Sequence, residues 1–144
     1  DAGTAGELIL GHEKQLEIAR IVRLYTWIAA PRIYIYELTE LLRGYNTWLR
    51  LSPRELAAVV DTASGLIDEY LDENELIADA LVLADEYGMS LSGGFYCAAA
   101  KSRNGVLISL DAALRTAARD AGISTAESIA NAPKLGVFEP PRRK

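Results

Sequence analysis

Hydrophobic residues recur every three or four positions along several stretches of the chain, a spacing that places them on one face of a helix. Between Glu13 and Trp27 the apolar positions are Leu16, Ala19, Ile21, Val22 and Leu24. This stretch predicts an amphipathic helix. The stretch from Glu37 to Leu49 has similar spacing and predicts a second helix that tolerates Gly44.

Helix start and stop signals place the later helices. Ser52 followed by Pro53, with a glutamate three residues after the serine, is a capping-box pattern that predicts a helix as far as Ser64.

Asp72 with a glutamate three residues on repeats the cap signal for a helix through Ala84, which Gly88 closes in the left-handed conformation. Further helices are predicted over Phe95–Ser102 and Ala112–Gly122.

Short apolar runs between these helices predict strands. "PRIYIYE", residues 31–37, is rich in β-branched and aromatic residues and indicates a strand buried on both faces. "GLIDEYLD" (65–72) and "GVLIS" (105–109) predict two more, and "KLGVFEPPRRK" (134–144) an edge strand before a basic end.

Strands that alternate with helices imply an α/β fold with a mostly parallel sheet covered on both faces, whose ligands lie outside the carboxyl ends of the strands. Glu37 and Asp111 stand at such ends, and Asp1 would follow a first strand expected before it. All three are acidic, and an oxygen-only site suits Mg²⁺ or Mn²⁺ rather than zinc.

The composition is that of one ordinary domain. The chain has 144 residues, half of them hydrophobic, and residues 1–144 are expected to form a single domain with a flexible tail at 139–144. No apolar run approaches the roughly 20 residues that cross a bilayer, and no signal-peptide pattern opens the chain. Cys97, the single cysteine, lies in an apolar run and cannot form an internal disulfide. These features predict a cytoplasmic protein without a membrane partner.

The formal net charge of −5 argues against a broad surface for nucleic acid. A negative net charge is still compatible with a local basic patch or with phosphate that is bound through metal ions. The basic residues nearest the acidic segments are either RNA-backbone contacts or ordinary solvated charges: Arg32, Arg43, Arg50, Lys101 and Arg103.

Four segments together resemble the PIN-domain family, and most closely its VapC-type toxins: "DAGTAGELILG", "YELTELLRG", "ELIADALVLADEYGMS" and "VLISLDAAL". Their order and spacing match the family over nearly the whole chain. The resemblance implies a three-layer α/β/α sandwich, a Mg²⁺-dependent endoribonuclease, a homodimer, and inhibition by a cognate antitoxin protein.

The resemblance also assigns site residues. Asp1, Glu37 and Asp111 take the positions of the metal-binding carboxylates, and Ser109 takes a hydroxyl position two residues before the last of them. Asp1 and Asp111 would bind the ion, Glu37 would bind it or orient the attacking water, and Ser109 would bond to a carboxylate or a phosphate. The family's fourth acid is missing, because "GMSLSGGFY" places Gly93 there.

Three explanations for Gly93 remain open. The glycine is a lost metal ligand that leaves an incomplete carboxylate cluster and impairs activity, or Gly93 and Gly94 expose backbone N–H groups that bind phosphate at a helix N-terminus. In the third, Ser90 or Ser92 caps the helix and the glycines only permit close packing.

Two other classes of enzyme fit less well. "DAGTAG" is similar to the phosphate-contacting turn of sugar kinases and actin-like ATPases, but the chain is far too short for that two-domain fold. A haloacid-dehalogenase-like phosphatase needs an acidic residue where Gly3 stands. The main rival is a PIN-like interaction module without catalysis.

Overall fold

The computed structural model describes residues 1–126, which contain seven α-helices and two short strands. The first four helices are α1 (Ala2–Leu10), α2 (Gln15–Val22), α3 (Ile33–Leu49) and α4 (Pro53–Ser64). The other three are α5 (Glu73–Tyr87), α6 (Leu91–Ser102) and α7 (Ala112–Asp120). The strands are β1 (Ala29–Pro31) and β2 (Glu69–Leu71).

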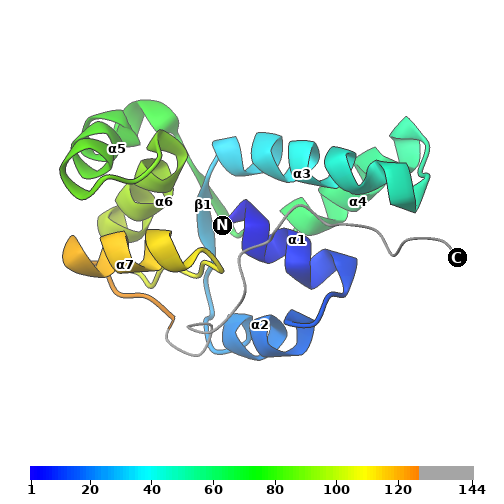
Figure 1. Cartoon of the computed structure of the whole chain (residues 1–144), viewed down its shortest axis with the longest axis horizontal. Helices are drawn as coiled ribbons and strands as arrows, with labels where there is room; N and C mark the ends of the chain where they lie inside the picture. Colours follow the sequence, from blue (N-terminus) through cyan, green and yellow to red (C-terminus); the bar gives the residue numbers. More distant parts are fainter. Residues whose placement is uncertain (127–144) are drawn as a thin grey trace, which may run out of the picture.

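The two strands pair in parallel, with Ala30 opposite Tyr70, and lie near the middle of the molecule. Figure 1 shows α5, α6 and α7 on one side of β1 and α1, α2, α3 and α4 on the other. The α/β class and the parallel pairing therefore agree with the sequence. Among residues 1–126 the sheet has only these two strands, together with one isolated parallel bridge between Leu107 and Thr125.

The strand predicted for residues 31–37 is wrong, because α3 begins at Ile33. Tyr34, Leu38 and Leu42 are buried at intervals of four residues, so the helical spacing continues through the β-branched run and determines the structure. The strand lies just upstream, at β1. Glu37 consequently sits in the second turn of α3 and not at the end of a strand.

The strand predicted for residues 105–109 is reduced to a single bridge. Leu107 donates its N–H to the Ser124 carbonyl at 2.8 Å and accepts from the Ala126 N–H at 3.1 Å. The strand at 65–72 is shorter than predicted, as β2. The edge strand at 134–144 and the tail at 139–144 lie outside the described residues.

The predicted caps are present. Ser52 and Glu55 form the reciprocal capping box of α4, and Gly88 ends α5 with a φ of 64°. Besides α3, two more helices differ from the prediction in extent: α2 covers only Gln15–Val22, and α6 begins at Leu91, four residues before Phe95. Helix α1 was not predicted, because its run of small residues has little apolar spacing.

The core forms where α6 packs against its neighbours. Helix α6 is buried continuously from Gly93 to Ala99, as expected of a helix with packing partners on every side. A Cβ atom at Gly94 would lie 2.4 Å from the Ala80 carbonyl oxygen, so the glycine allows α6 to approach α5 closely. Within residues 1–126, no helix combines the length and apolar character needed to cross a membrane.

Candidate functional site: a carboxylate-lined cavity

Four acidic residues line one cavity of about 750 Å³: the predicted site residues Asp1, Glu37 and Asp111, which lie far apart in the sequence, and Asp120 at the end of α7. Asp1 is the N-cap of α1, Glu37 belongs to α3, and Asp111 is the N-cap of α7. The beginning of α6, from Ser90 to Tyr96, completes the wall. The fold thus brings three of the predicted site residues to one place.

Asp1 is held by hydroxyl and amide donors. Its Oδ1 accepts from the Thr4 N–H at 2.8 Å and from the Thr4 hydroxyl at 2.7 Å. Its Oδ2 accepts from the Ser109 hydroxyl at 2.5 Å. Because Ser109 is fully buried and does not line the cavity, its role in this structure is to orient Asp1 from behind.

Glu37 connects α3 to α6. Its Oε2 accepts from the Tyr96 hydroxyl at 2.7 Å, and its Oε1 accepts from the Ser92 hydroxyl. Burial, together with the hydrogen bond to Glu37, raises the pKa of Tyr96 far above its ordinary value. Tyr96 therefore stays protonated and remains a donor to this carboxylate throughout the physiological pH range.

Asp111 is the most exposed of the three carboxylates. Its Oδ1 caps α7 by accepting from the Ala113 and Leu114 N–H groups at 2.8 and 3.2 Å. The Asp111 N–H donates to the Ser109 hydroxyl oxygen at 3.1 Å. Ser109 thus links Asp111 to Asp1, because the same hydroxyl bonds to both residues.

The cavity carries acidic charge without a basic counterpart. None of the residues that line it is lysine or arginine, and across residues 1–126 none of the three carboxylates forms an ion pair with a basic side chain.

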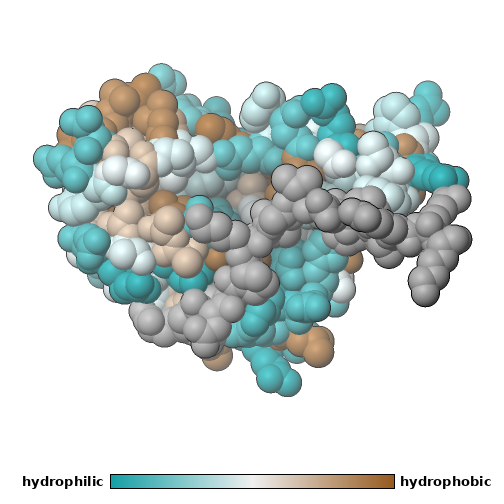
Figure 2. Space-filling view, viewed as in Figure 1, coloured by the Kyte–Doolittle hydropathy of each residue, from teal (hydrophilic) through white to brown (hydrophobic). Residues whose placement is uncertain are grey.

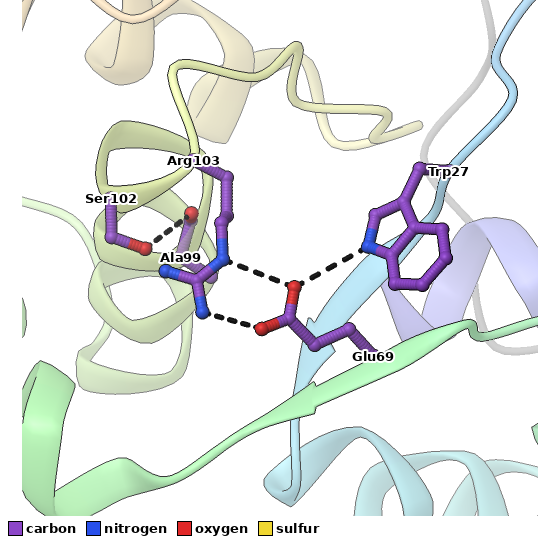
Figure 3. A network of polar contacts seen from close by, with 5 residues as sticks. All are labelled: Trp27, Glu69, Ala99, Ser102 and Arg103. Carbon is purple, nitrogen blue, oxygen red and sulfur yellow. Dashed lines mark hydrogen bonds and ion pairs between the residues drawn. The ribbon is translucent and has the colours of Figure 1, made fainter.

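Most of the basic residues near these segments pair with acids elsewhere on the surface. Arg32, Arg43, Lys101 and Arg103 contact Asp72, Glu40, Asp79 and Glu69, respectively. Figure 3 shows Arg103 and Trp27 both bound to Glu69, and none of these three residues lines the acidic cavity. A phosphate group that entered the cavity would therefore meet carboxylates and no basic side chain, so that a cation would be needed to offset the repulsion.

The side-chain atoms of the cavity that could bind a metal ion are of the type that a hard divalent ion prefers, but they are not placed to hold one. All of the side-chain donors around Asp1, Glu37 and Asp111 are oxygens, as Mg²⁺ prefers. No group of three or more His, Cys, Asp or Glu side chains in the part of the chain described by the structure is placed to hold a metal ion.

Gly93, which the resemblance places at the position of a fourth acid, lines the cavity. A Cβ atom there would lie 2.8 Å from Leu114 Cδ1 and 3.2 Å from the Ser90 hydroxyl oxygen. Since the closest atom is the end of a flexible leucine side chain, a larger residue requires Leu114 to move but leaves the backbone in place.

The hydrogen bonds of Gly93 and Gly94 also test the other two explanations for these glycines. The Gly93 N–H donates to the Ser90 hydroxyl at 3.0 Å and the Gly94 N–H to the Ser90 carbonyl at 2.8 Å. Both groups are used inside the helix, which argues against their binding phosphate. Ser90 is the cap and Gly94 provides the close packing, as the third explanation predicted.

Sequence reasoning missed the hydroxyl donors of the site. Ser92 and Tyr96 are four residues apart and therefore share one face of α6, and Thr4 follows Asp1 in the cap pattern. The first pair was hidden because the helix was expected to begin at Phe95.

No protein-family model matches the chain, and no curated protein matches it. The resemblance to PIN domains therefore rests on the sequence segments alone and stays a prediction.

Proposed function

We propose that this chain is an endoribonuclease of the PIN type, similar to VapC toxins, in which Gly93 leaves the Mg²⁺ site incomplete and activity low. The observation that carries the proposal is the convergence of Asp1, Glu37 and Asp111 on one cavity without a basic counter-charge. Such a cavity attracts cations.

In the proposed reaction, Asp1 and Asp111 would hold the divalent ion, and Glu37 would bind it or orient the attacking water. A bound divalent ion offsets phosphate charge and lowers the pKa of water, so that no side-chain nucleophile is needed. The hydroxyls of Ser92 and Tyr96 hold Glu37, and that of Ser109 holds Asp1. The oxygen donors are therefore already fixed in orientation, which favours a site of this kind.

The proposal includes partners as well as a substrate. A homodimer, an antitoxin protein and a cytoplasmic location accompany this type of enzyme, and exposed apolar residues offer contact surfaces. Trp48 and Leu49 are exposed at the end of α3. Figure 2 shows a hydrophobic patch over α5, where Ile77, Leu81 and Val82 are exposed.

The second candidate function is a PIN-like interaction module without catalysis. It is favoured by one observation: the three carboxylates accept hydrogen bonds from their own chain, and no metal-ready group of three exists within residues 1–126. In a module of this kind, Asp1 and Asp111 serve as helix caps and Glu37 as a link between α3 and α6.

A Mn²⁺ titration separates the two functions, with the Gly93→Asp chain as the test and Gly93→Asn as a control of similar size without the charge. Two unit charges about 4 Å apart near a protein surface interact by about 4 kcal/mol, and the double charge of Mn²⁺ roughly doubles this attraction before the cost of desolvation. We therefore expect Gly93→Asp to bind Mn²⁺ at least roughly tenfold more tightly than Gly93→Asn, which corresponds to about 1.4 kcal/mol. Equal affinity of the two variants would support the interaction module.

A further inference from the structure

Arg115 is the one lysine or arginine among residues 1–126 that the fold buries, and only 2% of it is exposed. It belongs to α7 and does not line the acidic cavity. A charged group inside a protein is costly unless it is hydrogen-bonded. The Arg115 guanidinium uses its Nη1 to donate to the Ser109 carbonyl at 2.7 Å. This contact connects α7 to the residue that orients Asp1.

The Ser109 carbonyl lies outside the hydrogen-bond pattern of the helix. That pattern begins at the cap of α7, where the Asp111 carbonyl accepts from the Arg115 N–H at 3.0 Å. Because Ser109 comes two residues before the cap, its carbonyl accepts from the guanidinium instead. Hydrogen bonds from a charged donor are shorter and stronger than neutral ones. Arg115 therefore fixes the backbone of residues 109–111, which we call the cap segment.

The cap segment is bonded to both carboxylate oxygens of Asp1. The Ser109 hydroxyl donates to Asp1 Oδ2 at 2.5 Å. The Leu110 N–H donates to the Thr4 hydroxyl oxygen at 3.1 Å, and that hydroxyl donates to Asp1 Oδ1 at 2.7 Å. Since Asp111 belongs to the same segment, a displacement of this backbone would move both aspartates.

We propose that Arg115 is a positioning residue of the carboxylate site, which holds Asp1 and Asp111 in place for a divalent ion through the cap segment. The inference rests on the proposed function and adds to it a residue that does not line the cavity. Residues that hold the ligands of a metal ion typically change the metal affinity by about 10–100-fold when they are mutated.

The charge of Arg115 acts in the opposite sense to its positioning role. A positive group behind the cavity repels a bound cation, so removal of the charge would by itself strengthen metal binding. Arg115→Lys separates the two effects, because lysine keeps the charge but lacks the planar guanidinium with its fixed donors. Ser109→Ala removes the hydroxyl that connects the cap segment to Asp1 Oδ2 and also leaves the charge in place.

A Mn²⁺ titration of the Gly93→Asp chain measures the effect on the site. In that chain, Arg115→Lys and Ser109→Ala should each weaken Mn²⁺ binding by roughly tenfold or more. The double variant should bind no more than about threefold more weakly than the weaker single variant, because both changes act on the same contact. Unchanged affinity in Arg115→Lys, or two losses that multiply in the double variant, would overturn the proposal.

Amide hydrogen exchange in the parent chain without metal measures how firmly the cap segment is held. Arg115→Lys should speed exchange at Leu110 and Asp111 by roughly tenfold relative to Leu42, a fully buried residue of α3. Ser52→Ala in α4 is the control, because a general loss of stability should leave this ratio unchanged. Exchange that rises equally at all three amides, or at none, would overturn the proposal. If Arg115→Lys did not fold, Arg115→Met would be measured in the same way.

The two measurements separate this inference from the nuclease function. Faster exchange confined to the cap segment would support the role of Arg115 even if no chain bound Mn²⁺, and that absence of binding would contradict the nuclease function alone. Mn²⁺ binding that is insensitive to Arg115→Lys would leave the nuclease function standing and overturn the role of Arg115.

Discussion

Gly93 and Gly94 stand side by side in the first turn of α6 and face different surroundings. A Cβ atom at Gly94 would meet the backbone of Ala80, whereas a Cβ atom at Gly93 would meet the end of the Leu114 side chain. The pair therefore combines a packing requirement at Gly94 with a replaceable position at Gly93. Sequence alone suggested both reasons for glycine but could not assign them, because the assignment depends on which helix packs against α6.

At the residue scale, Gly94→Ala should lower the free energy of unfolding by about 1–3 kcal/mol, the cost of overpacking a tight contact. Urea unfolding would measure it. The matched control is Gly44→Ala in α3, where no atom lies within 4 Å of a new Cβ. There, alanine should stabilise the helix by about 0.5–1 kcal/mol. Equal effects at the two positions would contradict the packing role of Gly94.

At the element scale, helix ends were predicted well and short strands poorly. The capping box at Ser52 and the left-handed Gly88 are local patterns that involve a few adjacent residues, and sequence displays them directly. β1 consists of Ala29, Ala30 and Pro31, which have no strand signal of their own. They become a strand because β2 pairs with them, and a single sequence does not show such pairing.

The capping box of α4 gives a direct test at this scale. Ser52→Ala removes the hydroxyl that accepts from the Glu55 N–H and should lower the free energy of unfolding by about 1 kcal/mol. Ser52→Gly should cost only a few tenths of a kcal/mol, since glycine is tolerated at a cap. Chemical denaturation of the two variants would measure both losses of stability. An equal loss for Ser52→Gly and Ser52→Ala would argue against the cap.

At the scale of the whole molecule, the convergence of Asp1, Glu37 and Asp111 was predicted for a partly wrong reason. Glu37 was expected at a strand end and lies in α3, yet it still lines the shared cavity. Its position depends on α6, whose Ser92 and Tyr96 hold it. Such contacts between distant segments could not be derived from spacing, whereas the acidic character of the three residues could.

The buried tyrosines make the whole fold sensitive to alkali. Burial, and secondarily Tyr70, raises the pKa of Tyr34, and burial with the Glu37 hydrogen bond raises that of Tyr96. The folded state thus retains protons that the unfolded state loses above about pH 10. The free energy of unfolding should therefore fall as the pH rises beyond that point, by about 1.4 kcal/mol per pH unit for each group.

Tyr34→Phe removes one of these groups and should flatten the decline between pH 10 and 11 in urea unfolding. Tyr36→Phe is the matched control, because Tyr36 is 68% exposed, and it should leave the slope of the parent chain. An identical slope for Tyr34→Phe and the parent would show that Tyr34 does not contribute.

The central claim, a nuclease site limited by Gly93, is tested most directly by RNA cleavage. The Gly93→Asp, Gly93→Asn and parent chains would be incubated with a panel of structured RNAs and Mg²⁺ or Mn²⁺, with chelator as control. A carboxylate at position 93 should increase cleavage at least roughly tenfold over asparagine, and chelator or an added Glu37→Gln should abolish it. Cleavage no faster with aspartate than with asparagine, or cleavage that survives chelator, would contradict the account.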